Sequence, residues 1–556
     1  MMKASALKRL AIKINVLFLA FIILVYITII LQPPYPFEDN AAGTLSNVDK
    51  IVGMAKLQDD DQKPLGFNST VFREGTRIGL VNIGEVEMIN WHKSIGKTMR
   101  RMIKFDTVPE DQLQWKELFP EWIDEEEENE TPACPEIPMP DFALYDEFDV
   151  VVTRLPCRRP EPGWGQDVQR LQIHLVAANL ALRRATRDER GRVKIVFHSA
   201  CRPMAEVFKC EDLVKKDGDW WFYEVDVGWL GEKLAMPVGS CKLALPLGQQ
   251  GANEVPANLH QREAYATVLH SSDIYVCGAI TLAQSIIKTG TSRDLILLHD
   301  NSIPRPKLRA LADAGWTLQE IKRIRNPHAA KNSYNKYNYS KLRLWQLTDY
   351  RKLIFVDSDV LVLRNLDILF SFPEMSAAGN DAHIFNSGVM VIEPSNCTFN
   401  RLMEQIKEVV SYNGGDQGFL NEAFPWWHRL PRRVNFLKNF WSNTTEEMAS
   451  KNALFASEPP ELYVIHFLGL KPWLCYRDYD CNWNVGDQRV YASDAAHWRW
   501  WRVHDEMSGE LQIFCGLSNR RNVELKKEIK KARDAEFGDG HWRLRILDGR
   551  RAAVRL

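Results

Sequence analysis

Two carboxylates that follow an apolar run are the residues best suited to chemistry. Apolar residues 353–356 lead directly into Asp357 and Asp359, and apolar residues resume at Val360. Carboxylates at the end of a buried strand cost free energy unless they are paired, hydrogen-bonded or bound to a cation. Two such hard oxygen ligands favour Mg²⁺ or Mn²⁺. We therefore predict a divalent metal site here; the alternative is a pair of carboxylates that only caps a turn.

The same spacing of two Asp residues occurs elsewhere in a different context. Asp59 and Asp61 lie in a polar segment, and Asp478 and Asp480 lie more than a hundred residues downstream of Asp357 and Asp359. We interpret both of these other pairs as chance matches, because it is the predicted buried strand that distinguishes Asp357 and Asp359.

A histidine after a second apolar run completes the candidate site. His466 follows residues 462–465, and Gly469 and Lys471 come soon after it. An imidazole added to two carboxylates favours Mn²⁺, with Mg²⁺ as the alternative. Glycine lets the backbone approach a phosphate closely, and lysine supplies a point charge for it. We therefore predict a diphosphate clamp; the alternative is an ordinary core histidine.

Two polar segments are candidates for the walls of the same site. Asn386, Ser387 and Gly388 offer an amide, a hydroxyl and bare backbone, which suits sugar hydroxyls, although an ordinary tight turn has the same composition. Residues 413–418 join a Gly-rich loop to an expected helix. There Asp416 either caps the helix or faces the reacting sugar.

An α/β fold must position these residues, because strand-like and helix-like segments alternate from about residue 260. We expect strands at 265–269, 295–298 and 352–356, and helices at 275–288, 306–314 and 340–347. This alternation is typical of a mostly parallel sheet that is covered by helices. Ligands of such sheets bind beyond the carboxyl ends of the strands, which is where Asp357 lies.

Three other regions surround this catalytic domain, which we place at residues 256–485. Residues 76–255 contain strand-like runs and a helix-like stretch that begins at Asp167, so we expect an α/β accessory domain. Residues 32–75 lack any periodicity and are expected to form a disordered stem. Residues 486–556 are expected to form a helical extension.

The N-terminus predicts a membrane anchor. Basic residues within 1–15 precede the apolar run 16–31, which spans about 24 Å at about 1.5 Å per residue. The following Gln-Pro-Pro lacks the small residues of a cleavage site. We therefore expect a single transmembrane helix at 16–31, a cytosolic tail at 1–15 and a lumenal catalytic domain.

Cysteine and asparagine usage agrees with a lumenal location. The chain has 10 Cys, which fits an oxidising compartment, and Cys475 and Cys481 are spaced to form a disulfide across a short loop. Acceptor triplets for N-glycosylation start at Asn68, Asn129, Asn338, Asn396 and Asn443.

The charge balance argues against a nucleic-acid partner. The chain carries 71 basic and 72 acidic side chains, without the basic excess that nucleic-acid binding requires. Its 18 Trp suit both sugar stacking and core packing. The oligomeric state stays open.

Six ordered motifs between about residues 260 and 480 resemble glycogenin-like members of glycosyltransferase family 8. Six motifs in the same order are far more specific than any one of them. They are the segments 265–275, 341–345, 355–359, 385–388, 414–418 and 466–473.

This resemblance implies a GT-A fold, which is a Rossmann-like fold, and retaining transfer from a UDP-sugar with Mn²⁺. It assigns Asp357, Asp359 and His466 to the metal. The donor-binding residues that it implies, with Asn413 added as a determinant of the donor sugar, are Leu269, Tyr275, Lys341, Asp357, Ser358, Asp359, Asn386, Ser387, Gly388, Asn413, Gly469 and Lys471. It places Lys341, Asp416 and Gln417 nearest the chemistry, with Asp416 as the candidate nucleophile.

The whole layout resembles the plant family that adds glucuronic acid to xylan. That resemblance implies a Golgi enzyme that moves glucuronate from UDP-glucuronate to O-2 of backbone xylose. Asn413 stands where glycogenin has Asp, and a neutral amide there is compatible with an anionic donor sugar. The alternatives are transfer of glucose, galactose or galacturonate, a non-catalytic sugar-binding or nucleotide-binding partner in a wall-synthesis complex, and a self-glycosylating primer.

Overall fold

The computed structural model describes residues 72–84, 87, 98–109, 113–120, 134–157, 164–244, 262–331, 333–380, 384–441 and 444–551. The expected tail 1–15 and anchor 16–31 lie outside these ranges, as does nearly all of the expected stem 32–75. Within the described ranges, no helix has the length and apolar character needed to cross a membrane.

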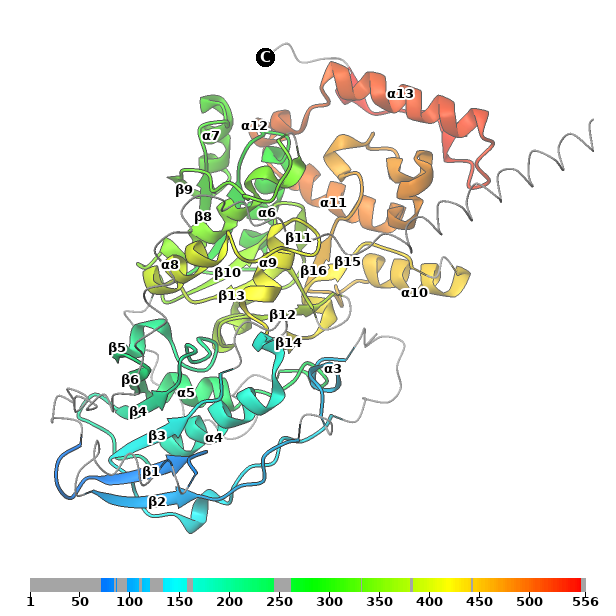
Figure 1. Cartoon of the computed structure of the whole chain (residues 1–556). Helices are drawn as coiled ribbons and strands as arrows, with labels where there is room; N and C mark the ends of the chain where they lie inside the picture. Colours follow the sequence, from blue (N-terminus) through cyan, green and yellow to red (C-terminus); the bar gives the residue numbers. More distant parts are fainter. Residues whose placement is uncertain are drawn as a thin grey trace, which may run out of the picture. The chain divides into compact units, whose positions relative to one another are not determined.

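The first sheet has six strands in the order β2-β1-β3-β4-β6-β5 (Figure 1). Strands β1 to β4 run parallel to one another, and β6 and β5 continue the sheet antiparallel. Helix α4 begins after Asp167, whose carboxylate accepts a hydrogen bond from the Arg170 amide, as the predicted N-cap. The elements are β1 (Arg77–Val81), β2 (Met99–Ile103), α3 (Trp115–Leu118), β3 (Val150–Arg154), α4 (Val168–Arg184), β4 (Arg192–His198), β5 (Leu213–Asp217), β6 (Trp220–Asp226) and α5 (Val227–Leu234).

The second sheet has seven strands in the order β14-β12-β13-β10-β7-β8-β9. Strands β10, β7, β8 and β9 are parallel, and β13 is antiparallel to β10, so this sheet is mixed. The elements are β7 (Glu263–Leu269), α6 (Val276–Lys288), β8 (Asp294–His299), α7 (Arg305–Asp313), β9 (Thr317–Glu320), β10 (Lys352–Val356), β12 (Ser376–Gly379), β13 (Phe385–Ile392), α8 (Asn396–Gln405), α9 (Asp416–Ala423) and β14 (His428–Leu430).

The expected helix at 340–347 is instead part of a longer 3₁₀ stretch, η5 (Tyr334–Gln346). Ser333 starts this stretch, and its hydroxyl accepts a hydrogen bond from the Asn335 amide. The tighter winding brings Lys341 and its neighbours in the second half of the stretch into the core.

A third, three-stranded sheet and a helical C-terminal region complete the described fold. The sheet order is β11-β16-β15, and the Trp-rich helix α11 buries Trp500 and Trp501 but leaves Trp498 half exposed. The elements are β11 (Val360–Val362), β15 (Phe436–Leu437), α10 (Thr445–Ala456), β16 (Val464–His466), α11 (Asp494–Glu506), α12 (Gly509–Gln512) and α13 (Asn519–Asp534).

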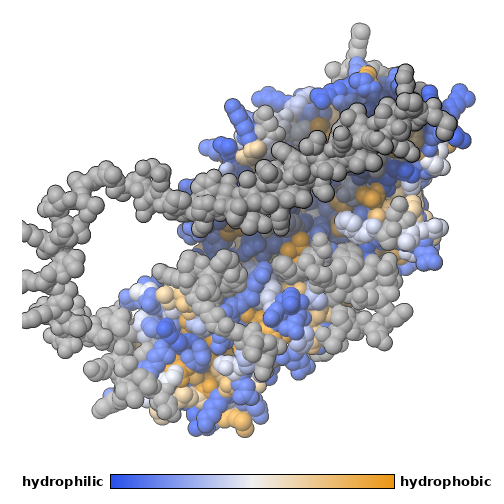
Figure 2. Space-filling view, turned by 45° about the vertical axis from the view of Figure 1, so that its right-hand side comes forward, coloured by the Kyte–Doolittle hydropathy of each residue, from blue (hydrophilic) through white to orange (hydrophobic). Residues whose placement is uncertain are grey.

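Polar and covalent contacts join the region of the first sheet to the region of the second. The disulfide Cys210–Cys397 links them, and Nζ of the buried Lys352 at the start of β10 lies 3.1 Å from Oε2 of Glu232. All ten cysteines are in disulfides, including the predicted pair Cys475–Cys481. The face seen in Figure 2 mixes hydrophilic and hydrophobic areas over the described residues.

Candidate active site

A fully buried strand and a tight turn hold the two carboxylates. Strand β10 is buried along its length, and the amide of Asp357, directly after it, donates to the Gly388 carbonyl at 2.9 Å. The amide of Val360 then donates to the Asp357 carbonyl at 3.2 Å, which closes the turn. The turn therefore places Asp357 and Asp359 at the carboxyl end of a central strand, where ligands of such sheets bind.

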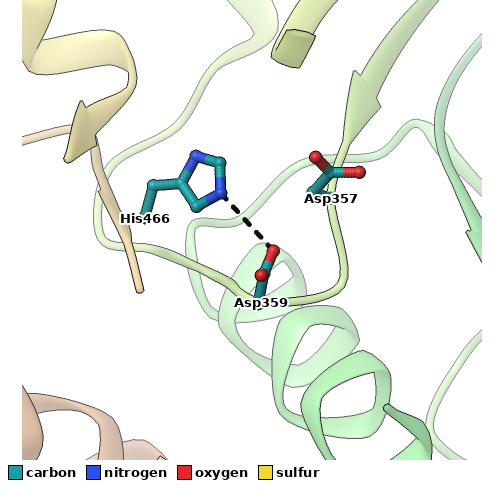
Figure 3. Close-up of side chains that lie close together, drawn as sticks. All are labelled: Asp357, Asp359 and His466. Carbon is teal, nitrogen blue, oxygen red and sulfur yellow. Dashed lines mark ion pairs between the residues drawn. The ribbon is translucent and has the colours of Figure 1, made fainter. Parts of the chain in front are cut away.

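Strand pairing brings His466 to the carboxylates. Strands β11 and β16 are antiparallel, with Val360 opposite His466, and the amide of Phe467 donates to the Asp359 carbonyl at 3.0 Å. One ligand atom from each of Asp357, Asp359 and His466 lies within 4.8 Å of the other two (Figure 3). His466 Nε2 is 3.5 Å from Asp359 Oδ1.

Hydrogen bonds identify which nitrogen of His466 faces the carboxylates as an acceptor. The Gly388 amide donates to Asn386 Oδ1 at 2.9 Å, which fixes that atom as oxygen. Asn435 Nδ2 donates to the same oxygen at 2.8 Å, so the other polar atom of Asn435 is its oxygen. That oxygen lies 3.0 Å from His466 Nδ1, which must therefore carry the proton. The lone pair of Nε2 is left to face Asp359, as a metal ligand requires.

The absence of a side chain at Gly388 makes room for this imidazole. A Cβ atom at position 388 would lie 2.4 Å from Cε1 and 2.6 Å from Nδ1 of His466. Strand β13 can therefore pass beneath the ring only with glycine at this position. The two carboxylates, the oriented imidazole and this space fit a divalent cation of the kind that takes mixed oxygen and nitrogen ligands.

Two lysines balance the negative charge of the site. Lys471 Nζ lies 2.8 Å from Asp359 Oδ2, and Lys341 Nζ lies 2.5 Å from Asp416 Oδ2 and 3.3 Å from Asp357 Oδ1. Lys341 is almost completely buried, so it sits as a cation between the carboxylates of Asp357, in the turn after β10, and Asp416, at the start of α9.

Burial and charge set the protonation of these groups. Burial raises the pKa of Asp357 to about 6, although Lys341 opposes the shift. Burial also acts on Asp359, but the ammonium group of Lys471 opposes it, and the pKa of Asp359 lies below its usual range. Burial of Asp416 is likewise outweighed by Lys341, which lowers the pKa of that carboxyl. Burial would lower the pKa of Lys341, yet Asp357 and Asp416 raise it.

These residues surround a cavity of about 520 Å³, a size that suits a small-molecule ligand. Most of the predicted site residues line it. Those that do are Leu269, Tyr275, Lys341, Asp357, Ser358, Asp359, Asn386, Ser387, Asn413, Asp416, Gln417 and His466.

Three predicted residues lie behind the cavity wall. Gly388 lies beneath the His466 ring, and Lys471 reaches the site through Asp359. Gly469 has a φ of +70°, and a Cβ there would lie 2.5 Å from Asn482 Oδ1. Glycine is thus required at position 469 by both backbone conformation and space.

The position of Asp416 decides between its two interpretations. Gly415 is the N-cap of α9, and Asp416 is its first residue. The Asp416 carboxylate contacts Lys341 and accepts a hydrogen bond from Ser387 Oγ at 3.2 Å. The N-cap interpretation is therefore wrong, and the carboxylate faces the cavity.

Asn413 is held so that its amide nitrogen is available. Its Oδ1 accepts from the Gly415 amide at 2.9 Å and from Ser411 Oγ at 2.9 Å. Because a backbone N–H must donate, this atom is the oxygen. Asn413 lines the cavity, so its NH₂ group is what it offers there.

The pair Asp478 and Asp480 is structural. Asp480 is 1% exposed and lies 2.5 Å from Lys438 Nζ, while Asp478 accepts hydrogen bonds from the amides of Leu547 and Asp548. Their interpretation as a chance match to the metal motif agrees with these contacts.

Sequence reasoning missed several residues of the site. Asn435, which orients His466, has no signal in the sequence because it follows a short 3₁₀ turn far from the motifs. His270, Tyr334 and Asn338 also line the cavity. His270 directly follows the motif residue Leu269, and Asn338 lies shortly before the motif residue Lys341. This proximity in sequence could have indicated both residues.

Comparison with known proteins agrees with this geometry. A model of glycosyl transferase family 8 matches residues 266–476, and a model of the GUX1-5 N-terminal domain matches residues 57–241. UDP-glucuronate:xylan alpha-glucuronosyltransferase 2 of Arabidopsis thaliana is 60% identical over 485 residues, which cover 86% of this chain and 81% of the relative. The chain belongs to glycosyltransferase family 8.

Other similar proteins match less of the chain. Glycogenin-1 of Caenorhabditis elegans is 34% identical over 38% of this chain and 51% of the relative. A solved structure of the galactosyltransferase LgtC with donor and acceptor sugar analogs is 18% identical, with a TM-score of 0.31 over 44% of this chain and 96% of that one. Family 8 membership implies a GT-A catalytic domain, a UDP-sugar donor and a divalent metal ion for this site.

Proposed function

We propose that this protein transfers glucuronic acid from UDP-glucuronate to O-2 of xylose in the xylan backbone, with retention of configuration. The observation that carries the proposal is the 60% identity to a UDP-glucuronate:xylan alpha-glucuronosyltransferase over 86% of the chain. The candidate site supports it, because the metal-ligating and lysine groups that a transferase of UDP-sugars needs lie around one cavity.

We propose Mn²⁺ as the metal, held by Asp357, Asp359 and His466. When bound, such an ion neutralises charge that develops on a departing diphosphate. Lys471, already paired with Asp359, would take up part of the same charge. Because Nδ1 of His466 is committed to Asn435, the ring is held with Nε2 toward the metal position.

The residues near the donor sugar fit an anionic group. Asn413 offers an NH₂ donor to the cavity, whereas an Asp at that position would present a second, negatively charged oxygen. A carboxylate on the donor sugar would be attracted by the former and repelled by the latter. This supports glucuronate over glucose or galactose.

We also propose that the protein is anchored in the Golgi membrane by residues 16–31 with its catalytic domain in the lumen. The five disulfides support an oxidising compartment. Targeting to the Golgi would bring the enzyme to the same compartment as a growing polysaccharide.

A donor and acceptor panel tests the proposal. The full-length protein, stripped of metal and then supplied with Mn²⁺ or Mg²⁺, is incubated with UDP-glucuronate, UDP-glucose, UDP-galactose or UDP-galacturonate. The acceptors are xylohexaose and, as a control, cellohexaose. We expect a product only from UDP-glucuronate and xylohexaose, with an α-1,2 linkage by NMR. Transfer from another donor would replace the donor assignment, and no transfer from any donor would favour a non-catalytic binding role.

A further inference from the structure

Two exposed tyrosines stand beside the cavity. The side chain of Tyr334 is 78% exposed and that of Tyr412 is 57% exposed. Tyr334 lines the cavity, and its Oη lies 3.5 Å from Oη of Tyr275. Tyr412 Oη accepts a hydrogen bond from Nε2 of Gln417, a cavity residue, at 2.8 Å. Both rings are therefore attached to the site while most of their surface faces solvent.

Hydrogen bonds hold the start of η5, which carries Tyr334, next to the loop that carries Tyr412. Asn335, directly after Tyr334, donates from Nδ2 to the carbonyl of Asn413, directly after Tyr412, at 3.2 Å. Asn326 Nδ2 donates to the neighbouring carbonyl of Gly414 at 2.9 Å. Each tyrosine directly precedes one of the two asparagines that this first hydrogen bond joins. The backbone therefore limits how far apart Tyr334 and Tyr412 can lie.

The space for Tyr412 is also specified. A Cβ at Gly418 would lie 2.9 Å from Cδ1 of Tyr412, so glycine at this position lets the ring pack against the first turn of α9. The same turn carries Gln417, which the Tyr412 hydroxyl holds. The Tyr412 ring therefore packs together with Gln417, a residue that faces the donor.

The chemistry of this pair fits an uncharged sugar chain. Exposed aromatic faces bind the apolar faces of pyranose rings, and tyrosine loses little conformational entropy on binding because it has only two side-chain torsions. The cations of the site are already engaged, since Lys341 pairs with Asp416 and Lys471 pairs with Asp359. Among the described residues beside the cavity, Tyr334 and Tyr412 offer aromatic surface, and Asn413 and Gln417 offer amides.

We propose that Tyr334 and Tyr412 form the acceptor subsite and stack against successive sugar rings of a neutral β-linked polysaccharide. This assignment rests on the proposed function for the identity of that polysaccharide, which is xylan. The hydrogen bond between Asn335 and Asn413 joins the residues that directly follow the two tyrosines, and Asn413 also carries the amide that faces the donor. The acceptor hydroxyl would therefore be presented on the side of the cavity that holds Asn413 and Gln417.

Paired substitutions test the subsite. Tyr334→Ala and Tyr412→Ala remove the rings, whereas Tyr334→Phe and Tyr412→Phe keep them. Tyr412→Phe also separates stacking from the hydrogen bond to Gln417. Trp498→Ala, which removes a 49% exposed aromatic ring that does not line this cavity, is the control.

Two measurements are made on each full-length variant. Titration calorimetry measures the affinity for xylohexaose, and steady-state assays measure KM for xylohexaose and for UDP-glucuronate. We expect each Ala variant to bind xylohexaose about tenfold more weakly, a loss typical of one aromatic contact, and to raise KM for the acceptor more than KM for the donor. The Phe variants should bind nearly as the unmodified protein does, and Trp498→Ala should match it.

The outcomes separate this inference from the proposed function. Unchanged xylohexaose affinity in both Ala variants, or no xylohexaose binding by the unmodified protein, overturns the subsite. Xylohexaose binding that depends on both rings, without any transfer from UDP-glucuronate, supports the subsite and overturns the proposed transfer.

Discussion

Asn435 Oδ1 lies 3.0 Å from Nδ1 of His466, and this contact decides which nitrogen of the imidazole a metal ion would meet. The amide of Asn435 cannot be reversed, because its nitrogen donates to Asn386 and Asn386 is fixed in turn by a backbone N–H. A relay of two side-chain amides, Asn386 and Asn435, therefore selects Nε2 of His466 as the nitrogen that can bind a metal ion.

Replacing Asn435 by Ala should weaken metal binding about 10- to 100-fold, the usual effect of losing a group that orients a metal-ligating histidine. Manganese affinity without donor or acceptor, measured by electron paramagnetic resonance, reads this directly. Asn439→Ala is a matched control, since Asn439 is equally buried and its side chain makes no hydrogen bond in the described part of the chain. Equal affinities in the two variants would contradict the relay.

Removing a ligand should abolish metal binding without unfolding the protein. We expect Asp359→Ala or His466→Ala to lose measurable Mn²⁺ affinity and transfer activity, while circular dichroism stays unchanged. Asp357→Ala should behave in the same way. Retention of full metal affinity by any of the three would remove that residue from the site.

Gly388→Ala should act like the loss of a ligand although it removes no donor atom. The added Cβ would lie 2.4 Å from the His466 ring, so the imidazole must leave the position in which Nε2 faces Asp359. Gly379→Ala, on the neighbouring strand β12, would place its Cβ 3.9 Å from the nearest atom, on Trp427. Metal affinity should fall at least about tenfold in Gly388→Ala and stay unchanged in the control.

Asn413→Asp should change which donor is preferred. The new carboxylate would face the cavity and repel the carboxylate of UDP-glucuronate. Two like charges within about 4 Å at the protein surface cost about 4 kcal/mol before screening, so the kcat/KM ratio of UDP-glucuronate to UDP-glucose should fall at least tenfold. Asn338→Asp adds the same charge elsewhere on the cavity wall and should alter the ratio less. An unchanged ratio in Asn413→Asp would rule out charge as the determinant.

Asp480→Asn should destabilise the protein without affecting metal binding. It would leave Lys438 buried without its ion-pair partner, which costs about 3–5 kcal/mol in other proteins. Burial acts against the charged carboxylate, but Lys438 outweighs it and holds the pKa of Asp480 below its usual value. The stabilisation is therefore present at neutral pH and is lost as the pH falls through that lowered pKa.

Urea unfolding at a series of pH values measures this contribution. The difference in unfolding free energy between the unmodified protein and Asp480→Asn should be largest at neutral pH and shrink below about pH 4. A difference that does not depend on pH would mean that the charge of Asp480 is not the stabilising feature.

The sequence was most informative where the site depends on consecutive residues. The run into Asp357 and Asp359 predicts the buried strand that the structure contains, and the two carboxylates that follow it are ones that the structure brings together with His466. The sequence did not suffice for Asn435, which acts only through the parallel pairing of β15 with β16. Nor could it decide the role of Asp416, since the same residue type caps helices and pairs with lysines, and only the position of Lys341 distinguishes the two.

The contacts between the first two sheets have a consequence for anyone who wishes to dissect this enzyme. Cys397 and Lys352 belong to the catalytic region, but their partners Cys210 and Glu232 belong to the region before it. A fragment cut at residue 256 would carry an unpaired thiol at Cys397 and would leave Lys352 without the nearer of its two carboxylate partners. The minimal autonomous enzyme is thus larger than its family 8 segment, and a truncation series should start upstream of the first sheet.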